Sequence, residues 1–224
     1  MSEIEKHFEA LAPHYDEIRA RNWYYYENLK KRYKKLVPER ERVLEVGCGT
    51  GEVLASLKPS FGVGIDISRK MIEIARGKFR SRPELQFFKA SAGDFKSGEN
   101  FDYIIMPDVI EHLEDVPATI RNVKNLMSPR TVFVISMANL LWEPVLWFAE
   151  KLKLKMEEGP HYRISLRALK KILQAEGLRV EEINYFLHIP VYIPVLSDFL
   201  NKTFSKLPFF NRLGLLIFLR LSQN

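Results

Sequence analysis

The chain has 224 residues, of which 46% are hydrophobic and 28% charged, and its formal net charge is +6. These values are typical of one globular domain and exclude a fibrous or disordered chain. No uninterrupted apolar run reaches the roughly eighteen residues that a membrane-spanning helix needs, and the charged N-terminus lacks the apolar core of a secretory leader. The single cysteine, Cys48, excludes an internal disulfide and favours a reducing compartment, so we expect a cytoplasmic protein.

Residues 1–37 are expected to form a helical cap, and residues 38–224 are expected to form one larger domain. The segment NWYYYENL, residues 22–29, concentrates aromatic side chains. Aromatic residues serve both as pocket walls and as core packing, so both roles stay open here. The basic stretch 29–42 is interpreted as a solvated helix face, and no RNA-binding signature accompanies it. Nucleic acid is therefore not the expected partner.

From residue 42 onward, predicted strands and helices alternate along the chain. Such alternation predicts a parallel sheet with helices on both faces, whose ligands bind outside the carboxyl ends of the strands. Acidic residues lie at or just after four of these ends, namely Glu45, Asp66, Asp94 and Asp108. The expected strands are 42–46, 61–66, 85–89, 103–106, 131–136, 179–186 and 213–221, and the expected helices are 52–58, 70–79, 119–127 and 166–176.

The segment VLEVGCGTGE, residues 43–52, is the most informative in the chain. A strand ends in Glu45 and is followed by glycines at alternate positions, Gly47, Gly49 and Gly51. Glycine allows positive φ in a tight turn and lets the backbone approach a ligand closely. The next strand ends in the acidic Asp66. This combination predicts a nucleoside-cofactor site, and the GxGxG spacing differs from the GxGxxG of dinucleotide-binding folds.

The motif resembles that of the class I S-adenosylmethionine (SAM) methyltransferases, written E/DxGxGxG. The resemblance implies an α/β fold with a three-layer Rossmann-like sheet, in which the last strand inserts antiparallel between two others. It also implies SAM as the cofactor. Segment 7–18 is similar to the N-terminal segment that covers SAM in many relatives. A basic residue usually meets the SAM carboxylate there, and Arg19 and Arg21 are both candidates.

The resemblance also implies a role for each residue of the cofactor site. Glu45 would organise the loop, and the backbone of Gly47 and Gly49 would approach SAM. Asp66 would accept the ribose hydroxyls, unless it only caps the following helix. The segment SAGDF, residues 91–95, resembles the next family motif, although an ordinary turn remains open for Asp94. The remaining expected contacts are Ile67 and Asp94 with adenine, the Phe95 N–H with adenine, and Cys48 and Pro107 beside the cofactor.

A second group of polar residues follows the fourth strand in FDYIIMPDVIEHLEDV, residues 101–116. On a helix, Asp108 and Glu111 would share one face with His112 adjacent. With His161, these residues resemble the metal-associated motifs of UbiG-like O-methyltransferases of ubiquinone biosynthesis and of small-RNA 2′-O-methyltransferases. The resemblance implies Asp108, Glu111, His112 and His161 as ligands of Mg²⁺, Mn²⁺ or Zn²⁺. Without a metal, His112 is the expected general base.

Two apolar segments with interleaved lysines, 139–156 and 188–212, lie outside the minimal fold. They suit peripheral contact with a membrane surface, a substrate lid or a dimer contact, and the oligomeric state stays open. We expect a SAM-dependent O-methyltransferase of a small or lipid-like hydroxylated substrate. The alternatives are a metal-independent N- or C-methyltransferase of a small metabolite, an RNA methyltransferase, and a SAM-binding regulator without catalysis.

Overall fold

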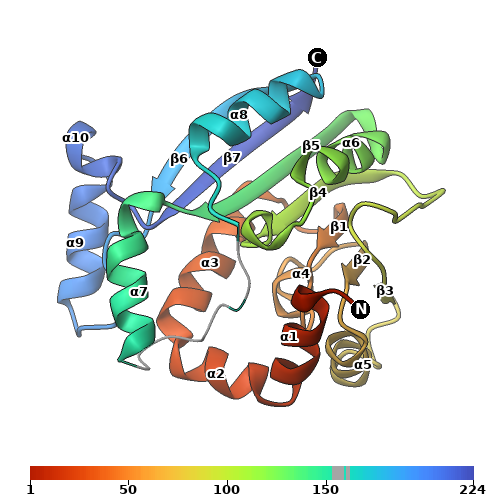
Figure 1. Cartoon of the computed structure of the whole chain (residues 1–224), viewed down its shortest axis with the longest axis horizontal. Coiled ribbons are helices and arrows are strands. Elements are labelled where there is room, and N and C mark those ends of the chain that lie inside the picture. The colour runs from red at the N-terminus through yellow and green to blue at the C-terminus, as the bar shows by residue number, and fades with distance from the viewer. Residues whose placement is uncertain (153–158, 160–161) are drawn as a thin grey trace.

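The computed structural model describes residues 1–152, 159 and 162–224, which form one seven-stranded sheet with helices on both faces (Figure 1). The strand order is β3-β2-β1-β4-β5-β7-β6. Strands β1 to β5 pair in parallel, and β7 runs antiparallel between β5 and β6. This is the predicted three-layer sheet with an antiparallel last strand. The strands are β1 (Arg42–Val46), β2 (Phe61–Asp66), β3 (Leu85–Lys89), β4 (Phe101–Pro107), β5 (Met127–Ala138), β6 (Leu178–Phe186) and β7 (Leu216–Gln223).

The sheet separates two apolar layers because successive side chains of a strand point to opposite faces. Leu44 and Val46 of β1 pack in the layer under α6 and α8, whereas Val43 packs in the layer under α3, α4 and α5. The helices are α3 (Trp23–Leu36), α4 (Glu52–Ser56), α5 (Arg69–Lys78), α6 (Val116–Asn125) and α8 (Leu166–Ala175). The sheet is therefore buried on both faces, which leaves the ends of the strands as the place for a site.

The predicted helical cap is present at the N-terminus. It consists of α1 (Glu3–Leu11), a 3-10 turn (Ala12–His14), α2 (Tyr15–Arg21) and α3. Leu29 and Tyr33 of α3 are fully buried in the domain core, whereas α2 contributes no buried residue. The third helix is thus part of the main core, and α1 and α2 lie over the carboxyl ends of the strands.

The two apolar segments predicted to lie outside the minimal fold form additional helices. The first contains a 3-10 turn, η3 (Leu140–Trp142), and α7 (Glu143–Lys151), and the second contains α9 (Leu196–Phe204) and α10 (Pro208–Asn211). In Figure 1, α7, α9 and α10 lie together on one side of the molecule. Within the described part of the chain, no helix has the length and apolar character needed to cross a bilayer.

Two of the element boundaries that differ from the sequence prediction lie around the fourth and fifth strands. Helix α6 begins at Val116 rather than 119, because the Asp115 side chain caps it by accepting the Ala118 N–H at 2.9 Å. Strand β5 begins at Met127 rather than 131, with a register shift in its pairing with β4. Residues 127–131 are therefore the irregular start of this strand.

Candidate active site

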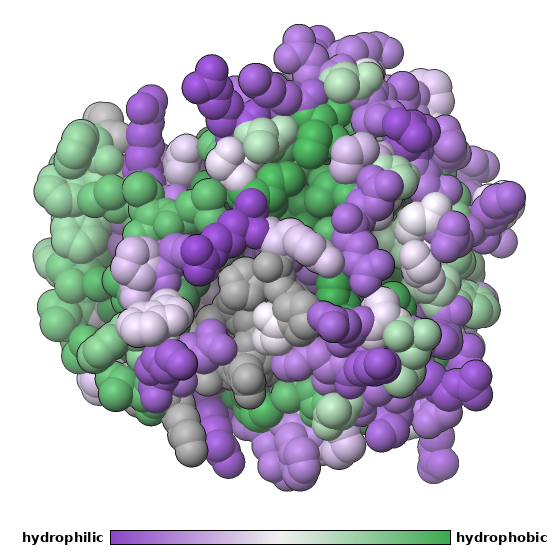
Figure 2. Space-filling model, in the orientation of Figure 1, coloured by the Kyte–Doolittle hydropathy of each residue, from purple (hydrophilic) through white to green (hydrophobic). Residues whose placement is uncertain are grey.

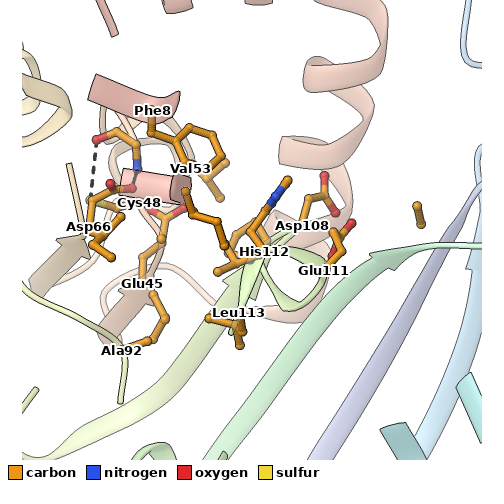
Figure 3. Close-up of a pocket in the computed structure, with 18 of the residues that line it drawn as sticks. Phe8, Glu45, Cys48, Val53, Asp66, Ala92, Asp108, Glu111, His112 and Leu113 are labelled. Carbon is orange, nitrogen blue, oxygen red and sulfur yellow. Dashed lines mark hydrogen bonds between the residues drawn. The ribbon is translucent and has the colours of Figure 1, made fainter. Parts of the chain in front are cut away.

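A cavity of about 640 Å³ lies at the carboxyl ends of β1, β2 and β4, between the sheet, the cap and α7. The order of the chain through the sheet reverses between β1 and β4, so the cavity lies at the topological switch point. Figure 3 shows Glu45 and Asp66 on one side of the cavity and Asp108, Glu111 and His112 on the other. The sequence-predicted residues that line it are Glu45, Gly47, Cys48, Gly49, Asp66, Ile67, Asp94, Pro107, Asp108, Glu111 and His112.

The glycine loop closes a sharp turn after β1. Gly47, Gly49 and Gly51 have φ angles of +71°, +52° and +82°, which side chains rarely adopt. A Cβ on Gly47 would lie 2.2 Å from a methyl carbon of Val109. The N–H groups of Gly47 and Cys48 both donate to the Ile65 carbonyl, at 2.8 and 2.9 Å. The loop is thus tied to the end of β2.

Asp66 joins this loop to the start of α5. Its two carboxylate oxygens accept the backbone N–H groups of Gly49 and Ser68, each at 2.8 Å. The side chain that caps α5 is that of Ser68, which accepts the Met71 N–H, so the alternative of Asp66 as the helix cap is wrong. Burial raises the pKa of Asp66 to about 6. An ionised carboxylate has about four acceptor sites, so Asp66 keeps acceptor capacity for a ligand in the cavity.

Glu45 lies beneath the loop and is almost fully buried. Its carboxylate accepts the Leu54 N–H at 2.8 Å. Burial raises the pKa of Glu45 to about 8, although the Leu54 hydrogen bond and the charge of Arg19 oppose this shift. Arg19 lines the same cavity from α2, with its guanidinium 4.3 Å from the centre of the Tyr26 ring. Between the two arginines that the sequence left open, the structure therefore places Arg19 at the cavity.

The SAGDF segment forms a turn beside the cavity. The N–H groups of Asp94 and Phe95 both donate to the Ser91 carbonyl, at 3.2 and 3.0 Å. Phe95 packs against the core and is not part of the cavity wall. Because its N–H is already used in the turn, the structure does not support the predicted donation from Phe95 to adenine.

Burial raises the pKa of the Cys48 thiol well above its ordinary value, as expected of a small buried side chain.

Asp108 does not lie on a helix, which corrects the sequence prediction. It has φ +52° and precedes a short 3-10 turn, Ile110–His112. Its carboxylate accepts the hydroxyls of Ser136, at 2.6 Å, and of Tyr25, at 2.7 Å. These bonds hold Asp108 against β5 and α3, so it cannot follow the helical spacing. Burial and the neighbouring Asp108 raise the pKa of Tyr25 well above its ordinary value.

His112 nevertheless faces the cavity together with Asp108 and Glu111 (Figure 3). Its ring meets that of Phe8 edge to face, with centroids 5.3 Å apart. The fourth predicted ligand, His161, lies outside the described residues. Among the residues that the structure does describe, no group of three or more His, Cys, Asp and Glu side chains is arranged to hold a metal ion. The four-ligand metal site stays a prediction.

The sequence did not assign several residues that line the cavity. Tyr25 and Tyr26 line the cavity, whereas Tyr24 is buried and its hydroxyl donates to Asp198 at 2.8 Å. The aromatic segment therefore serves both of the roles left open, because successive residues of α3 point in different directions. The far end of the cavity comes from the two additional segments and is apolar. Its lining residues are Trp142, Val145, Leu146, Ala149, Pro190 and Val191.

The fold is that of the class I methyltransferases. The family described as a methyltransferase domain matches residues 15–183, well over half of the chain, so the protein belongs to it.

Individual relatives are more distant. A malonyl-[acyl-carrier protein] O-methyltransferase of Halalkalibacterium halodurans is 25% identical over 59% of this chain and 54% of its own. A ubiquinone biosynthesis O-methyltransferase of Pelagibacter ubique is 30% identical over 56% of this chain and 54% of its own. The chain thus spans about half the length of these curated relatives.

The fold has close counterparts among solved structures. A SAM-dependent methyltransferase of Thermotoga maritima, described as a possible histamine N-methyltransferase, superposes with a TM-score of 0.74. The match covers 99% of this chain and 100% of that chain at 18% identity, so the likeness concerns the fold.

Proposed function

We propose that the protein transfers the methyl group of SAM to a hydroxyl of a small or lipid-like substrate. The observation that carries this proposal is the division of one cavity into two ends. One side has the glycine loop and Asp66, and His112 lies across the cavity from them with Asp108 and Glu111. The additional segments complete the lining with an apolar wall. The two relatives described above, both named as O-methyltransferases, support an oxygen atom as the acceptor.

In the proposed complex, SAM lies along the glycine loop. Asp66 accepts the ribose hydroxyls with its remaining lone pairs, and Ile67 and Asp94 contact adenine. Arg19, which reaches the same end of the cavity from α2, would meet the carboxylate of the methionine part. Glu45 supports the loop from below through its bond to the Leu54 N–H.

The proposed reaction is an in-line displacement at the sulfonium methyl group. The acceptor oxygen forms the new C–O bond while the C–S bond breaks, and S-adenosylhomocysteine leaves as a neutral thioether. A hydroxyl is a weak nucleophile until it loses its proton, and His112, which lines the cavity, would take that proton. With the acceptor bound against it, the apolar wall would exclude water, which would otherwise compete with the acceptor.

The metal-assisted version of this reaction uses the same residues. Asp108, Glu111, His112 and His161 would hold Mg²⁺, Mn²⁺ or Zn²⁺, and the metal would lower the pKa of the acceptor hydroxyl. Both oxygens of Asp108 already accept hydroxyl hydrogen bonds, from Ser136 and Tyr25. For this reason we favour His112 as general base. The same base also suits the alternative of a metal-independent N-methyltransferase.

Calorimetry of SAM binding tests this proposal first, on wild type and on His112→Ala, with EDTA and then with Mg²⁺, Mn²⁺ or Zn²⁺. We expect SAM to bind both proteins in EDTA, and a metal to bind neither. Radiolabelled SAM then reports methyl transfer to hydroxylated amphiphiles, with amines and RNA of similar size as comparison acceptors. Absence of SAM binding would contradict the whole proposal. Metal binding that His112→Ala removes would establish the metal-assisted version instead.

A further inference from the structure

Exposed apolar side chains are concentrated on one side of the molecule. Among the described residues, twenty large apolar side chains are exposed, and fifteen of them lie within segments 139–156 and 188–212. In Figure 2, hydrophobic residues gather at the side where Figure 1 places α7, α9 and α10. We call these fifteen residues the apolar face. Its most exposed members include Leu141, Trp147, Phe148, Val195, Phe199 and Phe209.

The apolar face is held together by polar contacts beneath it. The Asn139 side chain donates to the carbonyls of Arg212 and Gly214, at 3.0 and 2.9 Å, and the Trp142 indole donates to the Leu213 carbonyl at 2.7 Å. These bonds join the start of α7 to the chain after α10. Asp198 of α9 accepts the Tyr24 hydroxyl of α3. The face is therefore a built surface on the core rather than two separate loops.

The charge of the same segments favours an anionic partner. By sequence, segments 139–156 and 188–212 contain six lysines and arginines and three acidic residues, a net charge of +3, and two of the lysines, Lys153 and Lys155, lie outside the described residues. Of the acids, Glu143 pairs with Arg163 and Asp198 accepts a hydroxyl. Lys151, Lys202 and Lys206 are exposed beside the apolar side chains.

The apolar face is continuous with the acceptor end of the cavity. Val145 and Val191 line the cavity and are also 53% and 60% exposed. A protein partner that covered the face would cover this end of the cavity as well. A lipid bilayer would cover the face and at the same time offer an amphiphilic molecule to the cavity.

From these observations we infer that the apolar face docks on an anionic phospholipid bilayer. Aromatic side chains enter the boundary between headgroups and acyl chains, and lysines pair with the headgroups. The methyl acceptor then enters between α7 and the segment at Pro190–Val191 without leaving the bilayer. This last step rests on the proposed function, whereas docking itself does not.

Vesicle sedimentation with the full chain tests the docking. Vesicles contain phosphatidylcholine alone or phosphatidylcholine with phosphatidylglycerol. The test variant is Trp147→Ser/Phe199→Ser/Phe209→Ser, whose positions are exposed and do not line the cavity. The matched control is Phe88→Ser, because Phe88 is 39% exposed on the opposite edge strand, β3.

We expect wild type and Phe88→Ser to bind the anionic vesicles, and the triple variant to bind them at least about tenfold more weakly. Binding should also fall with added salt and with Lys151→Gln/Lys202→Gln/Lys206→Gln. Calorimetric SAM binding by the triple variant verifies that it is folded, and it separates failure of docking from failure of the proposed function.

Equal vesicle binding by wild type and the triple variant would overturn the inference, as would wild type that binds no vesicle. Sedimentation velocity tests whether a second copy of this chain covers the apolar face instead of a bilayer. A wild-type dimer that the triple variant lacks would make the apolar face a subunit interface and would also overturn the inference.

Discussion

At the cofactor end of the cavity, backbone groups make the contacts that hold the site together, whereas at the acceptor end side chains from distant segments make them. The glycine loop is tied to β2 through the Ile65 carbonyl and to Asp66 through the Gly49 N–H. The acceptor end depends on Tyr25, Asp108 and Ser136, which come from α3, the end of β4 and β5. The cofactor end is consequently local in sequence, and the acceptor end is assembled only by folding.

The largest effect that separates the two ends should come from His112→Ala. If His112 is the general base, kcat falls about 100- to 10,000-fold while SAM binding is unchanged, because the histidine belongs to the acceptor end. Single-turnover rates with radiolabelled SAM measure the first quantity and calorimetry the second. His14→Ala, at an exposed histidine paired with Glu17, is the matched control. A parallel loss of SAM affinity would place His112 at the cofactor end instead.

Gly47→Ala tests the backbone-built end. The new Cβ would meet Val109 at 2.2 Å at a φ of +71°, so we expect a loss of about 2–4 kcal/mol in the free energy of unfolding and no measurable SAM binding. Urea unfolding and calorimetry measure both quantities. Gly77→Ala, where a Cβ meets nothing within 4 Å, should be neutral or slightly stabilising. Wild-type SAM affinity in Gly47→Ala would show that the loop does not approach the cofactor.

Asp66→Asn should weaken SAM binding by about 2 kcal/mol, roughly 30-fold, because an amide can accept at only one of its two polar atoms. The pKa of about 6 adds a pH signature. Wild-type SAM affinity should fall as the pH drops below about 6 and the carboxylate is protonated, whereas the variant should show no such step. A step of equal size in the variant would assign the titration to another group.

The raised pKa of Asp66 also makes folding stability depend on pH, in the opposite direction to the SAM affinity. The ordinary pKa of an aspartate carboxyl is 3.8, so between pH 3.8 and about 6 the folded protein without SAM holds a proton that the unfolded chain releases. The free energy of unfolding should therefore fall as the pH rises through this window. Chemical denaturation at several pH values measures it, and Asp66→Asn should remove this contribution.

The smallest effect is expected at the contact between the cap and the acceptor end. Tyr25→Phe removes the donor to Asp108 and should lower the free energy of unfolding by about 1.5 kcal/mol, with a further rise in the KM of the acceptor. Thermal or urea unfolding measures the loss. Tyr192→Phe, at a ring that is 48% exposed, is the comparison variant. Equal stability of both variants would mean that the Tyr25 bond does not anchor the cap.

The cofactor loop could be predicted from the sequence because its features are local. Alternating glycines after a strand allow the positive φ angles that the loop adopts, and Asp66 ends the neighbouring strand. The geometry of Asp108 could not be predicted in this way. Its three-residue spacing from Glu111 suggested a helix, but hydroxyls from positions 25 and 136 hold it outside one. Similarly, the motif at Phe95 suggested an N–H donor to adenine, but the Phe95 N–H already donates to the Ser91 carbonyl in a local turn.

By itself, the sequence determined the parallel sheet, its antiparallel last strand as implied by the family resemblance, and the place of the glycine loop, because hydrophobic period and backbone freedom are local properties. Only the tertiary structure decided that Arg19 rather than Arg21 reaches the cavity and that Tyr25 rather than Tyr24 faces it. It also brought α7 beside α9 and α10 as one apolar face. Side chains distant in sequence meet only when the whole core is packed, so no local pattern specifies these choices.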